Sequence, residues 1–95
     1  MAEFRNATPE EIERARHAVR AKPWGQALLS SHGARAVAAD HRDECFVWLY
    51  DRDPDSVLAG EEYSTIFVRF APERPPHVAC FRSRRREDGS DDTII

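Results

Sequence analysis

Residues 45–50 read Cys-Phe-Val-Trp-Leu-Tyr, and residues 62–70 read Glu-Tyr-Ser-Thr-Ile-Phe-Val-Arg-Phe. Both runs are rich in the β-branched and aromatic residues that favour extended strands. Because side chains alternate between the two faces of a strand, one face of the first run should hold Phe46, Trp48 and Tyr50. The other face should hold Cys45, Val47 and Leu49. Neither face is polar, so the sequence predicts a sheet with apolar side chains on both sides.

Two more runs, residues 34–39 and 77–83, are typical of strands, and turn-forming segments separate all four. The polar residues 41–44 suit a hairpin. Residues 51–60 and 71–76 contain prolines, which cannot donate to a strand ladder. None of these links is long enough for a helical crossover, so we expect neighbouring strands to be antiparallel and to follow chain order.

The N-terminal part predicts two helices. Thr8 can cap a helix, Pro9 supplies the fixed φ of its first position, and Glu11 completes a capping box. Pro23 should end this helix near Ala21. Residues 24–31 then indicate a second, shorter helix. The predicted fold is α+β: two helices followed by a four-stranded antiparallel meander sheet.

The chain of 95 residues is short enough for one domain only. We place this α+β domain in residues 1–83, and the charged residues 84–95 are predicted to be a disordered tail. No apolar run approaches the ~20 residues of a membrane span, so we expect no membrane partner. Residues 1–6 lack the pattern of a secretory signal, which predicts a cytoplasmic location.

An uncovered aromatic face gives the main hypothesis about function. The predicted helices carry too little apolar surface to cover both faces of a sheet. A large exposed apolar patch is typical of a surface that binds another protein or a second copy of the chain, as a homodimer. The residues predicted to form this interface are Phe46, Trp48, Tyr50, Tyr63 and Phe67. The alternative is that Phe4, or the 51–60 loop with Val57 and Leu58, folds over the face and completes the core.

Arginines give a second hypothesis. The net charge is −3, which offers no overall attraction for nucleic acid, but residues 69–86 contain six arginines and one acid. An RNA-binding protein or a metal-independent ribonuclease could stack nucleobases on its aromatic rings and bind phosphates with these arginines. The residues for this alternative are Arg69, His77, Arg82, Arg84, Arg85 and Arg86. The order of helices and sheet resembles small bacterial toxin-type ribonucleases, without a shared motif.

The remaining candidates for chemistry point to structural roles. Cys45 and Cys80 lie in apolar runs and should be reduced thiols on strands separated by a third. His77 and Cys80 differ by an odd number of positions, so they would lie on opposite faces and could not share a zinc ion. His32 adjoins a helix end, where capping or exposure is expected. The sequence therefore predicts no catalytic residue, no metal and no cofactor, and it favours binding over enzymatic activity.

Overall fold

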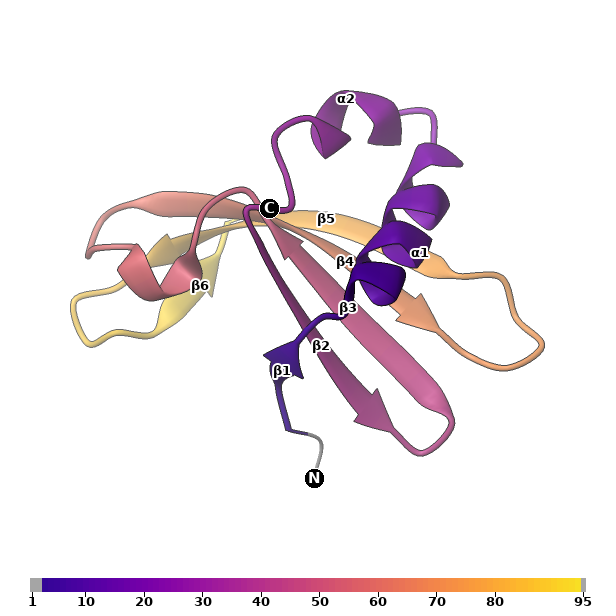
Figure 1. The fold of residues 1–95 in the computed structure, drawn as a ribbon. Coiled ribbons are helices and arrows are strands. Elements are labelled where there is room, and N and C mark those ends of the chain that lie inside the picture. Colours follow the sequence, from indigo (N-terminus) through magenta and orange to yellow (C-terminus); the bar gives the residue numbers. More distant parts are fainter. Residues whose placement is uncertain (1–2, 95) are drawn as a thin grey trace.

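The computed structural model describes residues 3–94 as a six-stranded sheet with two α-helices and one short 3-10 helix (Figure 1). In chain order the elements are β1 (Arg5–Asn6), α1 (Pro9–Arg20), α2 (Gly25–Leu29), β2 (Arg35–His41), β3 (Glu44–Tyr50), η1 (Pro54–Ser56), β4 (Glu62–Phe70), β5 (His77–Arg85) and β6 (Asp91–Thr93). Each strand pairs antiparallel with the next in the order β1-β2-β3-β4-β5-β6. The α+β class is confirmed.

The sheet has two more strands than the sequence predicted. The four predicted strands correspond to β2–β5, and the short strands β1 and β6 extend the sheet at its two edges. Residues 84–95 were expected to form a disordered tail; Ile95 lies outside the described residues, whereas Arg84 and Arg85 complete β5 and Asp91–Thr93 form β6. The turn between them uses Gly89 at φ 88°, and the backbone N–H of Arg86 donates to the Ser90 carbonyl at 2.8 Å. Low hydrophobicity suggested disorder, but opposite charges hold this hairpin together.

The predicted cap of α1 is present. The Glu11 backbone N–H donates to Thr8 Oγ1 at 3.2 Å, and the Thr8 N–H donates to the Glu11 carboxylate at 2.9 Å. This capping box satisfies two backbone donors that a helix start otherwise leaves free. At α2 a side chain at Gly25 would place its Cβ 1.8 Å from the Val19 carbonyl oxygen. Only glycine permits the two helices to approach so closely.

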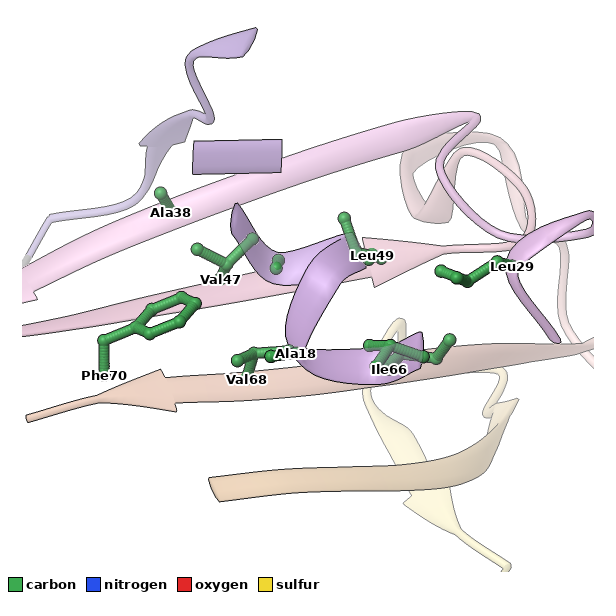
Figure 2. Packing of buried hydrophobic residues seen from close by; sticks show 10 residues of the cluster. Ala18, Leu29, Ala38, Val47, Leu49, Ile66, Val68 and Phe70 are labelled. Carbon is green, nitrogen blue, oxygen red and sulfur yellow. The ribbon is translucent and has the colours of Figure 1, made fainter. Parts of the chain in front are cut away.

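The core lies between the helices and one face of the sheet (Figure 2). Four helical residues contribute, Ala15, Ala18, Val19 and Leu29. The strands contribute Ala38, Val47, Leu49, Ile66, Val68 and Phe70. The β3–β4 register sets Val47 beside Val68 and Leu49 beside Ile66, so these side chains share one face. Both α-helices cover this face, which leaves the opposite face of β2–β5 without an α-helix.

Candidate functional site

The face opposite the helices carries the aromatic side chains that alternation predicted. The strand register sets Trp48 beside Phe67, and Phe46 lies on the same face two residues along β3. The ring centroids of Trp48 and Phe67 are 5.3 Å apart, those of Phe46 and Phe67 are 6.0 Å apart, and those of Phe46 and Trp48 are 6.2 Å apart. These separations allow direct ring contact. All three side chains remain partly exposed.

Phe4, the residue directly before β1, also belongs to this cluster. Its ring meets Trp48 edge-on with a centroid distance of 5.1 Å, and the residue is 70% exposed. The β1–β2 pairing brings this N-terminal residue to the edge of the sheet. We call Phe4, Phe46, Trp48 and Phe67 the open aromatic face. Phe4 therefore borders the face and enlarges it, and its own ring contact is with Trp48.

The 51–60 loop covers the other end of the same face. Val57 is buried, and Arg85 donates from its guanidinium to the carbonyl oxygens of Val57 at 3.0 Å and Pro54 at 2.8 Å. Tyr63 is only 8% exposed, and its hydroxyl donates to Asp91 at 2.6 Å. Burial raises the pKa of Tyr63 above its usual value, and the Asp91 carboxylate adds to the effect. Tyr63 shares the predicted face but is not available to a partner.

Tyr50 lies at the boundary between the covered and open parts. It is half-buried, and its ring centroid is 6.0 Å from that of Tyr63. Burial raises the pKa of its phenol, while Arg35 acts in the opposite direction. The register sets Arg35 directly beside Tyr50. Of the five predicted interface residues, four are therefore partly exposed and one, Tyr63, is buried; the four are Phe46, Trp48, Tyr50 and Phe67.

The arginines proposed for phosphate binding already have carboxylate partners. Glu62 accepts from both Arg82 at 3.1 Å and Arg84 at 2.7 Å. The other pairs are Arg69 with Glu44, Arg85 with Asp91, and Arg86 with Asp92. These arginines are therefore paired with carboxylates from β3, β4 and β6, which neutralise much of the charge of the basic segment. A phosphate at any of these arginines would compete with a carboxylate that is already bound there.

The residues proposed for ribonuclease chemistry do not gather at one point. Arg69 and His77 are cross-strand neighbours on the face opposite the helices. Arg82 is five residues from His77, which places it on the opposite face and about 17 Å along the strand. Within the described part of the chain, His77, the candidate general base, and the two arginines therefore do not surround a common position.

His32 has a structural environment. Its Nδ1–H donates to the Leu28 carbonyl at 2.9 Å, and its Nε2 is hydrogen-bonded to the Ser64 hydroxyl at 2.9 Å. The ring is buried and ties the end of α2 to β4. The expected capping role is confirmed, whereas the alternative of exposure is not.

Among residues 3–94, one group of side chains has metal-ligand types at close range, namely Glu11, Asp40 and Cys45. The Arg5 guanidinium already lies among them, 2.7 Å from Glu11 and 2.8 Å from Asp40. It lowers the pKa of Glu11 to about 2, chiefly through its hydrogen bonds. Cys45 and Cys80 are both free thiols. Arg5 thus supplies the positive charge that these carboxylates require and joins β1, α1 and β2.

No known protein family, curated protein or solved structure matches the chain. Among residues 3–94, no helix is long and apolar enough to cross a membrane. The role of the open aromatic face must therefore be inferred from its own geometry. Alternation along the strands identified three of its four rings, and the sequence offered Phe4 only as one of two alternative covers for the face. The sequence did not single out Arg35, the residue beside Tyr50, because which arginines have carboxylate partners depends on contacts between distant parts of the chain and leaves no local pattern.

Proposed function

We propose that this chain is a protein-interaction module that binds another protein through the open aromatic face. A regulator, an adaptor or an inhibitor acts in this way, by occupying its partner without chemistry. The observation that carries the proposal is the contact between four rings on the side of the sheet that the helices leave free. Aromatic side chains are enriched at the centres of protein interfaces, where they bury large areas at low entropic cost.

The shape of the face favours a narrow occupant. The 51–60 loop packs over one end through Val57 and the hydrogen bonds of Arg85, and Phe4 borders the face at the β1 edge. A flat sheet face would suit the equivalent face of a second copy at about 10 Å separation. These two borders instead leave a bounded surface, which fits a helix or an extended segment of another protein.

The charges near the face also favour a protein partner over RNA. Single-stranded RNA needs stacking rings together with cations that are free to bind phosphates. Here the arginine nearest the rings on β4, Arg69, is paired with Glu44, and the arginines of β5 are paired with Glu62 and Asp91. The rings themselves remain available, and apolar contact is the main interaction they offer.

Site-specific photocrosslinking tests this proposal. A benzophenone side chain at position 67 lies on the open aromatic face, and the same group at exposed Gln26 in α2 provides a matched control on the helix side. In the cells that produce the protein, position 67 should yield a discrete adduct that position 26 does not. The partner protein found in this adduct is then purified. It should bind Phe46→Ser at least tenfold more weakly than it binds the wild type, and it should bind Arg20→Gln as tightly as the wild type.

Two results would overturn the proposal. The first is the same set of adducts from positions 67 and 26. The second is an adduct with the mass of two copies, together with a dimer in light scattering, which would make a second copy the occupant. Circular dichroism of each variant shows whether lost binding reflects lost folding.

A further inference from the structure

A pocket of about 480 Å³ adjoins the open aromatic face at the β1 edge. Its apolar walls come from Phe4, Val37 and Pro54, and Tyr50 and Arg35 add a phenol and a guanidinium. Phe4 belongs to both the pocket and the aromatic cluster, so the two surfaces are continuous. The pocket therefore combines apolar walls with a cation beside a surface that lacks its own cover.

Arg35 differs from the other arginines on the described strands. Each of the others has a carboxylate within 4 Å, namely Arg5, Arg69, Arg82, Arg84 and Arg85. Arg35 has no such partner among residues 3–94, and its Nε is buried without a hydrogen-bond acceptor. Burying a donor of a charged group without an acceptor is costly. The terminal nitrogens of the same guanidinium are not buried in this way, so an acceptor in the pocket can pair with the charge through them.

We propose that this pocket binds a carboxylate that is attached close to an aromatic or large apolar group, with Arg35 as the anion-binding residue. The planar guanidinium can donate two parallel hydrogen bonds to a carboxylate, a geometry that lysine does not offer. The apolar walls receive the attached group. The inference rests on the proposed function, because it assigns this chemistry to the segment of the partner that lies on the open aromatic face.

Two other charged residues line the pocket, and they limit what it accepts. Arg5 is already bound by Glu11 and Asp40 on the helix side of the sheet. Asp55 lines the pocket near Pro54 and repels a second negative charge. A single carboxylate bound on the Arg35 side is therefore favoured over a doubly charged phosphate, and removal of the Asp55 charge should strengthen binding.

Nuclear magnetic resonance titrations with small probes test this site without the protein partner. N-acetyl-phenylalanine carries a terminal carboxylate, its amide derivative lacks the charge, and N-acetyl-aspartyl-phenylalanine amide carries the carboxylate on a side chain. We expect saturable shifts at Arg35 and Tyr50 with at least one carboxylate probe. The neutral amide should bind at least tenfold more weakly. The stronger of the two carboxylate probes shows whether a chain end or an acidic side chain fits the pocket.

Variants decide whether Arg35 is the anion-binding residue. Arg35→Gln should abolish the shifts, and Arg35→Lys should weaken binding at least fivefold while it keeps the positive charge. Arg20→Gln is the matched control, since Arg20 is a surface arginine paired with Glu13, and it should bind as the wild type does. Asp55→Asn should bind the probe several-fold more tightly.

Three outcomes would overturn the inference. Equal binding of the carboxylate and amide probes would show that the charge is not recognised. Unchanged binding by Arg35→Gln would show that another residue recognises the carboxylate. In Asp55→Asn, the Arg35 Nε–H could exchange faster with solvent than in the wild type while no probe binds. That result would show that Asp55 is the partner of Arg35 in solution. Each result is independent of the photocrosslinking experiment, so failure of the pocket and failure of the aromatic face are distinguishable.

Discussion

Val47 and Trp48 are consecutive in β3, yet they have opposite environments. Val47 is fully buried beneath the helices, and Trp48 lies on the other side of the sheet between Phe4 and Phe67. A strand turns successive side chains to opposite faces, so one residue of sequence separates the core from the open aromatic face. This division of the sheet leads to predictions for stability, reactivity and binding.

Two phenylalanines of β4 test the division directly. Phe70 is 5% exposed beneath Arg14, whose guanidinium lies 4.1 Å from its ring centroid, and Phe67 is on the open aromatic face. Phe70→Ala should lower the free energy of unfolding by about 3 to 4 kcal/mol, the usual cost of emptying a core site. Phe67→Ala should cost about 1 kcal/mol, since less area is lost. Urea denaturation measures both values, and equal costs would contradict the assignment of the two faces.

Arg5 and Glu11 should make stability depend on pH. A carboxyl group whose pKa is lower in the folded state stabilises the fold above its unfolded-state pKa, and this stabilisation is lost as the pH falls through the folded-state value. For Glu11 the window runs from its ordinary value of 4.5 down to about 2. Partial exposure of the pair reduces the expected loss to about 1 kcal/mol.

Glu11→Gln isolates this effect because the amide oxygen can still accept in the capping box. Thermal denaturation across the pH window should show a smaller acid-induced loss for Glu11→Gln than for the wild type. Glu13→Gln, at an exposed position on α1, is the control and should follow the wild type. Identical pH profiles for the wild type and Glu11→Gln would show that Arg5 does not act on Glu11 in solution.

The two thiols should differ in reactivity. Burial raises the pKa of Cys45 to about 11, and the nearby carboxylates of Glu11 and Asp40 contribute to the rise. Since the thiolate is the reactive form, Cys45 should react with iodoacetamide at pH 8 more than about 100-fold more slowly than an unperturbed cysteine. Cys80 is exposed and should react first. Mass spectrometry of Cys80→Ser should show almost no labelling until the protein is unfolded, and rapid labelling of Cys45 would refute the prediction.

The paired arginines should leave the protein with no useful affinity for RNA. Fluorescence anisotropy of a labelled single-stranded RNA should stay flat at both about 50 mM and about 200 mM salt. Glu62→Gln frees Arg82 and Arg84 from their shared carboxylate and offers a sensitive comparison, because it should raise any residual binding. Salt-dependent binding by the wild type that disappears in Arg82→Gln would restore the RNA hypothesis.

Local patterns in the sequence predicted the main parts of the fold. The Thr8 capping box, the hairpin at 41–44 and the alternation in β3 each depend on neighbouring residues, and the structure confirms all three. The open rings Phe46, Trp48 and Phe67 follow from the same alternation. The α+β class required only the change from helical to strand periodicity along the chain.

The remaining features depend on residues far apart in the sequence. Strand β6 is held in place by hydrogen bonds from Arg85 and Tyr63 to the Asp91 carboxylate. The composition of this segment alone indicates only a charged tail. The 51–60 loop buries Val57 against the sheet, which removed Tyr63 from the predicted interface. Arg35 stands out only when the partners of every other strand arginine are known. Such pairings are tertiary contacts and leave no periodic signal.

Hydroxyl-radical footprinting of the free protein tests the central claim most directly, because it compares like residues within one molecule. Phe4 and Phe70 are chemically identical, and Trp48 can be compared in the same way with Trp24, an exposed residue at the start of α2. Differences in oxidation rate within each pair therefore report solvent access. If the open aromatic face lacks a cover from its own chain, Phe4, Trp48 and Phe67 should be oxidised readily, while Phe70 is protected until the protein unfolds. Protection of the rings on the open aromatic face to the level of Phe70, in a sample that light scattering shows to be monomeric, would contradict the account.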